Sequence, residues 1–217
     1  MEIKYMDITN YYTANASRYI ADTFNSDMSE IRNRFLSSLT HQSERCHSMT
    51  EGAGGITILD AGCGSGRDSK AFKESGFDVY AMDASESMVE HCRTIIGDRC
   101  RLAAFQEYHT DIKFDGIWAC ASLLHLKPEE LDAVLKKFTR FLKPGGVFFM
   151  SFKYGEKDYI KDGRYFNCHT SETITELLNT LEEAEIIENF ITSDVREGRS
   201  GEKWVNVIVR NKKTGSL

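Results

Sequence analysis

"ILDAGCGSGRDS" (58–69) carries Gly62, Gly64 and Gly66 directly after an apolar run and an aspartate. Glycine has no Cβ, so a loop of this kind brings the backbone close to a ligand. The apolar run before the loop predicts a strand, and the residues after it predict the start of a helix. In an open α/β sheet, ligands bind at this edge, where the parallel strands end.

Two common phosphate-binding motifs do not fit this loop. A Walker loop needs G-x-x-x-x-G-K-[ST], but the sixth position counted from Gly62 is Arg67. The dinucleotide fingerprint G-x-G-x-x-G needs its third glycine where Arg67 stands. Arg67 and Asp68 at the start of the helix instead suit a ligand that has a carboxylate and a cationic centre.

Asp83 ends the next apolar run, "FDVYAMD" (77–83), about 20 residues after the glycine loop. A carboxylate at the end of the second strand can accept hydrogen bonds from both hydroxyls of a ribose. The alternative is that Asp83 only caps the helix that follows. With the glycine loop in register upstream, we favour a ribose, which many adenosine ligands share.

Strand and helix patterns alternate on both sides of this core and predict an α/β fold with a mostly parallel sheet covered on both faces. Strands are expected at 56–61, 77–83, 100–105, 114–120 and 146–152, and helices at 8–24, 27–39, 67–75, 86–96, 129–142 and 171–184. The runs 185–194 and 204–212 have no helix between them, so they predict an antiparallel hairpin. A polar linker is expected at 41–55. We divide the single domain into N-terminal helices at 1–50 and a core at 51–217.

Composition narrows the class of protein. The chain has 217 residues and a net charge of −6, which disfavours nucleic-acid binding because that usually needs a basic surface. No apolar stretch has membrane-spanning length and no signal-peptide pattern is seen, so we expect a cytoplasmic protein without a membrane partner. The six cysteines contain no C-x-x-C pair. They predict reduced thiols and no metal site.

Four motifs in this order, "ILDAGCGSGRDS", "VYAMDAS", "FDGIWACASLLHL" and "FLKPGG", resemble the class I S-adenosylmethionine (SAM)-dependent methyltransferases. The resemblance is strongest over residues 56–152. The flanks "YYTANASRYI" (11–20) and "DGRYFNCHT" (162–170) are similar to small single-domain bacterial members, distantly similar to tellurite-resistance methyltransferases. This resemblance implies a Rossmann-like, doubly wound sheet of seven strands whose last strand is antiparallel. It also implies SAM as cofactor, S-adenosylhomocysteine (SAH) as product, and N-terminal helices that cover the cofactor.

The resemblance also implies a set of cofactor-binding residues. The methionine part would contact the backbone of Gly62, Cys63 and Gly64, with Asp60 behind the loop. The adenosine part would contact Asp83, Ala84 and Met88, and Phe105 or Gln106 would substitute for an acidic adenine contact, because this chain has Ala104 there. The remaining contacts would come from Ala119, Cys120, Tyr11 and Tyr19.

The acceptor side is less defined. His125 follows the fourth strand and is the candidate base or orienting group, although a loop histidine satisfied by the backbone is the alternative. The segment "KYGEKDYIKDGRYF" (153–166) predicts either a solvated charged loop or a lid. In the lid, Arg164 would pair with an anionic acceptor while Tyr165 and Phe166 wall the pocket. Tyr12 is a further candidate contact to the acceptor.

Several functions remain open at this point. We favour methyl transfer to a small-molecule acceptor by in-line displacement, which needs positioning more than catalytic side chains. A tRNA or protein methyltransferase of the same fold and a non-catalytic SAM-binding module are the alternatives. A nicotinamide-dependent dehydrogenase is more distant, because the third glycine is missing.

Overall fold

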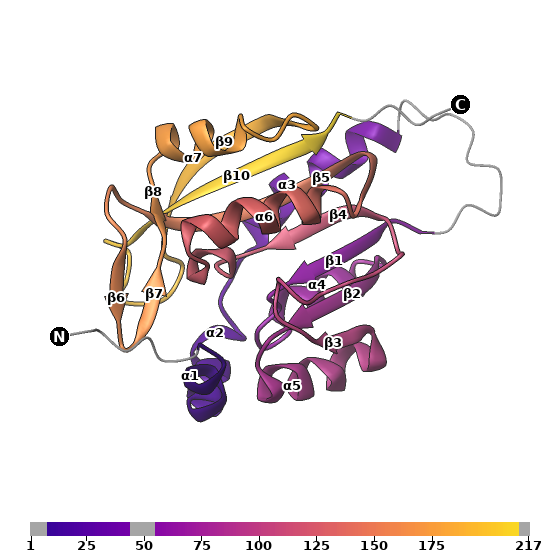
Figure 1. Ribbon diagram of the computed structural model, residues 1–217. Coiled ribbons are helices and arrows are strands. Elements are labelled where there is room, and N and C mark those ends of the chain that lie inside the picture. Colours follow the sequence, from indigo (N-terminus) through magenta and orange to yellow (C-terminus); the bar gives the residue numbers. More distant parts are fainter. Residues whose placement is uncertain (1–7, 44–54, 213–217) are drawn as a thin grey trace.

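One mixed sheet runs through the molecule, with strand order β3-β2-β1-β4-β5-β10-β9 (Figure 1). The computed structural model describes residues 8–43 and 55–212. The strands of the sheet are β1 (Thr57–Ala61), β2 (Asp78–Asp83), β3 (Cys100–Leu102), β4 (Phe114–Ala119), β5 (Leu142–Tyr154), β9 (Ala184–Ser193) and β10 (Lys203–Asn211), with the short β8 (Cys168–His169) beside β5. A separate hairpin consists of β6 (Tyr159–Lys161) and β7 (Arg164–Phe166).

Strand β10 runs antiparallel to both of its neighbours, β5 and β9, whereas the pairs formed by β1 to β5 are parallel. This arrangement confirms the predicted Rossmann-like fold with an antiparallel last strand. The predicted hairpin of the last two runs is also confirmed. Strand β8 pairs parallel with β5 and adds a short eighth strand outside the continuous path.

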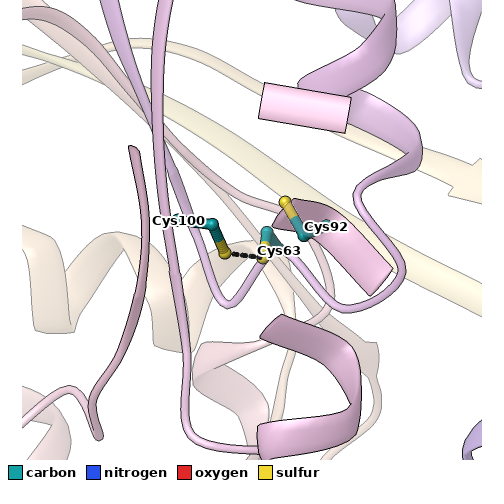
Figure 2. A group of neighbouring side chains, drawn as sticks. All are labelled: Cys63, Cys92 and Cys100. Carbon is teal, nitrogen blue, oxygen red and sulfur yellow. Dashed lines mark hydrogen bonds between the residues drawn. The ribbon is translucent and has the colours of Figure 1, made fainter. Parts of the chain in front are cut away.

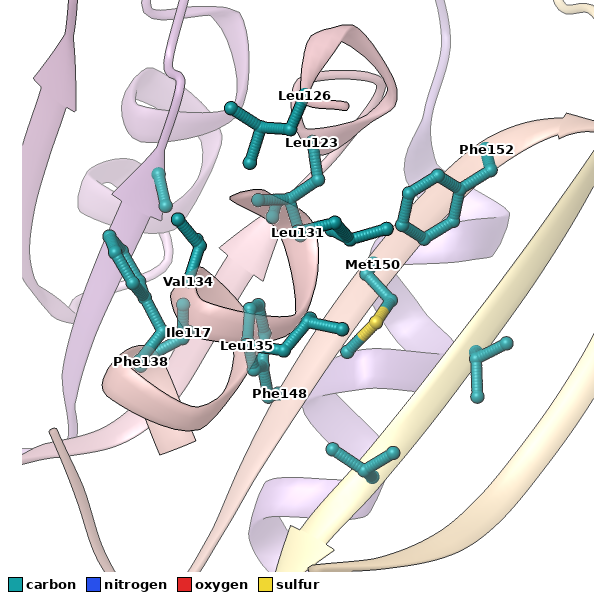
Figure 3. Close-up of a cluster of buried hydrophobic side chains, with 14 of the residues drawn as sticks. Ile117, Leu123, Leu126, Leu131, Val134, Leu135, Phe138, Phe148, Met150 and Phe152 are labelled. Carbon is teal, nitrogen blue, oxygen red and sulfur yellow. The ribbon is translucent and has the colours of Figure 1, made fainter. Parts of the chain in front are cut away.

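The helices are α1 (Ile8–Ala14), α2 (Ala16–Thr23), α3 (Ser29–Ser43), α4 (Arg67–Glu74), α5 (Glu86–Ile96), α6 (Pro128–Thr139) and α7 (Ser171–Leu178), with short 3₁₀ turns at Gly97–Arg99 and Leu123–His125. Helices α3, α4 and α5 cover one face of the sheet, and α6 and α7 cover the other. Alternate side chains of each strand point to opposite faces. On β1, Ile58 therefore belongs to the apolar cluster that includes residues of α3, α4 and α5, whereas Leu59 belongs to the cluster that includes residues of α6 and α7. Figure 3 shows the second of these clusters, with Leu131, Leu135 and Phe138 of α6 packed over β4 and β5.

The N-terminal region differs from the single helix expected at 8–24. Asn15 leaves the helical conformation and separates α1 from α2. Its side-chain Nδ2 donates to the carbonyl of Tyr11 at 2.9 Å and shares this acceptor with the backbone amide of Asn15, at 3.0 Å. The break lets α1 contact α5. Figure 1 shows α1 and α2 beside α5, near the edge of the sheet where the parallel strands end.

Two further expectations need correction. The strand expected at 100–105 ends at Leu102, because Ala104 accepts two turn hydrogen bonds, from Glu107 and Tyr108. The segment 153–166 is a loop only at 155–158: its first residues complete β5, and its last residues form the β6–β7 hairpin. Asp162 and Gly163 have φ of 52° and 75° and form its two-residue turn, a sequence pair typical of tight hairpins. Most of the linker expected at 41–55 lies outside the described residues.

Within residues 8–43 and 55–212, no helix is long and apolar enough to cross a membrane. The prediction of a cytoplasmic protein stays a prediction.

Candidate active site

The glycine loop begins where β1 ends and passes beside the end of β2. The amides of Gly62 and Cys63 both donate to the carbonyl of Met82, at 2.8 and 3.0 Å. Gly62 has a φ of 76°, and a Cβ built on it would lie 2.4 Å from the Cβ of Ser122. A side chain at this position would therefore cause both backbone strain and a steric clash. The loop requires glycine here for its close approach to the segment after β4.

Asp83 ends β2 with its carboxylate directed at the glycine loop. One oxygen accepts from the amide of Gly64 at 2.8 Å, and the other accepts from the amide of Ser85 at 2.9 Å. Burial raises the pKa of Asp83, although these backbone amides oppose the rise. A carboxylate can accept about four hydrogen bonds. The carboxylate therefore keeps acceptor capacity for hydroxyls such as those of a ribose.

A buried charge network supports the loop from below. Asp68, at the start of α4, accepts from Arg67 at 2.6 Å, from Arg32 at 2.7 Å and from the indole of Trp118 at 3.1 Å. Burial alone raises the pKa of Asp68, but the guanidinium groups of Arg67 and Arg32 together outweigh it, so the pKa is lowered. Asp60 accepts from the Ser69 hydroxyl at 2.7 Å, and burial raises its pKa. The network fixes the Arg67 guanidinium at the wall of the site.

These residues surround a cavity of about 350 Å³, which we call the loop cavity. Its volume is in the range of small-molecule sites. Of the cofactor-binding residues expected from the sequence, the structure brings together on its wall Tyr19, Asp60, Gly62, Cys63, Gly64, Asp83, Ala84, Met88, Phe105, Gln106 and Cys120. Two expected residues are not on this wall. Tyr11 lines the neighbouring cavity, and Ala119 is fully buried and lines neither cavity.

A second cavity of about 310 Å³, the hairpin cavity, lies between the N-terminal helices, the β6–β7 hairpin and the ends of β9 and β10. The two cavities share part of their walls, which consists of Tyr12, Tyr19, Thr23, Arg67, Cys120, Ala121 and His125. Ala121 has a φ of 52°, an unusual value for a residue other than glycine, and such strain is typical of functional sites. Because the two cavities share this part of their walls, a ligand in one cavity would be a neighbour of a ligand in the other.

His125 is held on both sides of its ring within that wall. Nδ1 lies 2.8 Å from the carbonyl oxygen of Tyr165, which only accepts, so Nδ1 carries the hydrogen. Nε2 of the neutral ring is then an acceptor, and the Tyr12 hydroxyl donates to it at 2.9 Å. Burial lowers the pKa of His125 to about 4. The ring is therefore neutral near pH 7 and forms one unit with Tyr12.

Arg164 brings positive charge into the hairpin cavity. Its guanidinium carbon lies 3.9 Å from the ring centroid of Tyr11 and 5.2 Å from that of Phe166. Its nitrogens reach the Tyr12 hydroxyl and Asp162 only at 3.5 Å, and its buried Nε has no hydrogen-bond partner. A guanidinium that is nearly desolvated and poorly paired favours an anionic ligand.

Tyr165 has a different position from the one expected. It lines neither cavity, its hydroxyl donates to Asp158, and its backbone carbonyl holds His125. The alternating geometry of β7 explains this, because neighbouring residues of a strand point to opposite sides and Phe166 faces the cavity.

Cys120 lines both cavities, but its chemistry is limited. Burial raises the pKa of its thiol to about 12, so it stays protonated near neutral pH. This argues against a covalent role, in agreement with the absence of a proline before it.

Sequence reasoning did not identify Glu130. This residue lies in the first turn of α6 and lines the loop cavity beside Gln106, whose side chain donates to it at 3.0 Å. An acidic side chain is therefore present near the position where the sequence has Ala104. The sequence pattern of helix α6 indicates only a helix start at this point, so no local signal could have revealed the contact.

The comparisons with known proteins agree with this architecture. Residues 58–146 match a family described as "Methyltransferase domain". This match confirms the resemblance to class I SAM-dependent methyltransferases; the finer similarity to tellurite-resistance methyltransferases stays a prediction.

Two curated relatives show the extent of the likeness. A cypemycin N-terminal methyltransferase of a Streptomyces species is 34% identical over 102 residues, which cover 44% of this chain and 41% of the relative. A malonyl-[acyl-carrier protein] O-methyltransferase of Erwinia pyrifoliae is 33% identical over 98 residues, which cover 44% of this chain and 37% of the relative. The chain thus spans about two fifths of the length of these relatives.

Among solved structures, the 1,6-didemethyltoxoflavin-N1-methyltransferase of Burkholderia thailandensis matches with a TM-score of 0.67. It is 20% identical, and the match covers 96% of this chain and 92% of that one. That structure holds 1,6-didemethyltoxoflavin and SAH. At this level of identity, the likeness establishes the fold.

Proposed function

We propose that this chain is a SAM-dependent methyltransferase that acts on a small anionic acceptor. The observation that carries this proposal is the shared wall of the two cavities at the carboxyl edge of the sheet. A cofactor in the loop cavity and an acceptor in the hairpin cavity are then neighbours. Transfer of a methyl group from one to the other requires this proximity. The methyltransferase-domain match over residues 58–146 supports the same cofactor.

The residues of the loop cavity fit SAM in chemical type. The carboxylate of Asp83 has acceptor capacity left for ribose hydroxyls. Met88 is an apolar residue of this wall and suits a flat adenine, while Glu130 and Gln106 offer oxygen acceptors for its amino group. Arg67 is the positive group on the shared wall and suits the methionine carboxylate.

SAM supplies an electrophilic methyl group on its sulfonium when it is bound. The chain itself needs to align the acceptor with that methyl and to exclude water. Aromatic side chains of Tyr11, Tyr12, Tyr159 and Phe166 wall the hairpin cavity and can hold a planar acceptor. Arg164 at that wall would pair with a carboxylate of the acceptor, which fixes its orientation.

The Tyr12–His125 pair can accept a proton if the acceptor carries one. The Tyr12 hydroxyl oxygen takes the acceptor's proton while its own proton moves to Nε2 of His125, along the existing 2.9 Å hydrogen bond. Because the pKa of His125 is low, this pair is a weak base. It suits acceptors that lose their proton as the methyl group arrives.

The test is transfer of an isotopically labelled methyl group from SAM. Small aromatic and aliphatic carboxylates that also bear a thiol, amine or hydroxyl are offered as acceptors, together with their neutral amide counterparts. The proposal predicts labelled product and equimolar SAH from at least one carboxylate, and much less from its amide. If SAH binds but no acceptor of either kind is methylated, a non-catalytic SAM-binding module is the better description.

A further inference from the structure

Three cysteines meet directly beneath the glycine loop, although they are far apart in the sequence. Cys63 belongs to the loop, Cys92 to α5, and Cys100 begins β3. Their sulfurs all lie within 4.8 Å of one another, and the sulfurs of Cys63 and Cys100 are 3.8 Å apart (Figure 2). We call this group the cysteine triad.

The spacing of the triad is that of ligands sharing one ion. Two thiolates bound to one zinc at about 2.3 Å and at the tetrahedral angle lie about 3.8 Å apart. Cys63 and Cys100 already have this separation. The remaining sulfur needs a shift of about 1 Å to complete a three-sulfur set. A rotation of the Cys92 side chain on α5 is sufficient for a shift of this size.

The donor set selects the kind of ion. Thiolates favour soft ions such as Zn²⁺, Cd²⁺ and Cu⁺ over hard ions such as Mg²⁺. Among the described residues, no fourth Cys, His, Asp or Glu joins the group. Three thiolates bring three negative charges into a buried place, so a divalent ion leaves less uncompensated charge than a monovalent ion.

We propose that Cys63, Cys92 and Cys100 bind a divalent thiophilic ion of the zinc type through their three sulfurs. Binding breaks three S–H bonds, releases three protons to solvent and forms three metal–sulfur bonds, with no change in oxidation state.

The path to the triad runs through the loop cavity. Cys92 and Cys100 are fully buried, whereas Cys63 keeps 9% of its surface exposed and lines that cavity. An ion must therefore pass the place that the cofactor would occupy. This part of the inference rests on the proposed function. It predicts that SAH, once bound, slows the entry of the ion.

The experiment titrates the reduced full chain with Cd²⁺ without oxygen and follows the near-ultraviolet absorption of cadmium–thiolate bonds. We expect one Cd²⁺ per chain, with loss of the band in Cys63→Ala, Cys92→Ala and Cys100→Ala. Cys168→Ala is the matched control, because Cys168 is a buried free cysteine outside the triad. Cys46→Ala is a second control, at a position outside the described residues. Circular dichroism verifies that each variant is folded.

A chain loaded with Zn²⁺ is expected to release one Zn²⁺ for each Cd²⁺ that it binds, because the softer Cd²⁺ binds thiolates more strongly. Absence of the band, or a band that survives in all three triad variants, overturns the site and makes the triad an apolar packing group. A chain that binds Cu⁺ but takes up no Zn²⁺ contradicts the assignment to a divalent ion of the zinc type.

A second arm repeats the titration after saturation with SAH. We expect the band to form at least about ten times more slowly, as a covered entrance requires. An unchanged rate with SAH bound contradicts the entry path. If calorimetry detects no SAH binding, the proposed function fails, while the cadmium stoichiometry still tests the triad by itself.

Discussion

The Tyr12 hydroxyl donates to Nε2 of His125 at 2.9 Å across 113 positions of the chain. The bond joins the first N-terminal helix to the segment that follows β4. Because Nδ1 is already committed to the carbonyl of Tyr165, the bond to Tyr12 is the one that satisfies Nε2. The N-terminal helices are therefore attached to the shared wall of the two cavities by a defined polar contact.

Tyr12→Phe should lower the free energy of unfolding by about 1–2 kcal/mol, because it leaves the buried Nε2 of His125 without a donor. Urea denaturation measures this loss. Tyr154→Phe, which alters an exposed tyrosine outside both cavities, serves as the control. Equal stability of the two variants would show that the Tyr12–His125 bond contributes nothing to the fold.

His125 should make stability depend on pH in a defined window. Burial lowers its pKa from 6.5 to about 4, so between these values the unfolded chain binds more protons than the folded chain. Stability therefore falls as the pH drops through this window, by up to about 3 kcal/mol. Denaturation at a series of pH values should show a smaller fall in His125→Gln than in the unaltered chain.

The control for this pH series is His109→Gln, which replaces an exposed histidine. It should keep the full pH dependence. A His125→Gln variant that loses stability with falling pH as steeply as the unaltered chain would rule out a buried neutral His125.

Gly62→Ala separates a steric clash from backbone strain when it is compared with Gly76→Ala. Both glycines have positive φ, 76° and 88°, but a Cβ at Gly76 has nothing within 4 Å, whereas one at Gly62 lies 2.4 Å from Ser122. Gly76→Ala should cost about 1–2 kcal/mol from the left-handed backbone alone. Gly62→Ala should cost about 1–3 kcal/mol more. Thermal unfolding compares them, and equal losses would show that the loop adapts to a side chain.

Much of the fold could be predicted from the sequence, because the signals are local. The glycine loop, the aspartate that ends β2 and the alternating apolar runs each reflect a conformation of a few adjacent residues. Such patterns also predict which sheet edge holds the site. The N-terminal break was missed because Asn15 acts through its side chain on Tyr11, and an apolar pattern does not record such competition.

The rest of the site depends on contacts between distant segments. The interpretation of 153–166 from the sequence rested on its charges, which are typical of a solvated loop. It did not use Asp162–Gly163, which is a sequence pair typical of a hairpin turn. Tyr165 and Phe166 could be assigned to opposite sides only once β7 was known. The cysteine triad has no spacing motif, since its members come from a loop, a helix and a strand.

Arg164→Gln should weaken recognition of an anionic acceptor. Loss of a charged hydrogen-bond donor costs about 1.5–3 kcal/mol, which corresponds to a 10- to 150-fold rise in KM for a carboxylate substrate. The dissociation constant of SAH should change less than twofold, because Arg164 does not line the loop cavity. Steady-state kinetics and calorimetry measure the two effects separately.

Arg199→Gln is the matched control, since Arg199 lines the same hairpin cavity but has a side chain that is 47% exposed. It should raise KM far less. If the two variants behave alike, or if neutral amides are methylated as well as carboxylates, Arg164 does not select the charge of the acceptor.

The central claim is that the loop cavity binds SAM through Asp83, and calorimetric titration with SAH tests it most directly. We predict one SAH per chain and a loss of affinity of at least about 100-fold in Asp83→Ala, because the ribose hydroxyls lose a charged acceptor. Asp78→Ala, at the opposite end of β2 and away from the cavity, should bind as the unaltered chain does. Absence of SAH binding to the unaltered chain, or equal affinity of the two variants, would contradict the account.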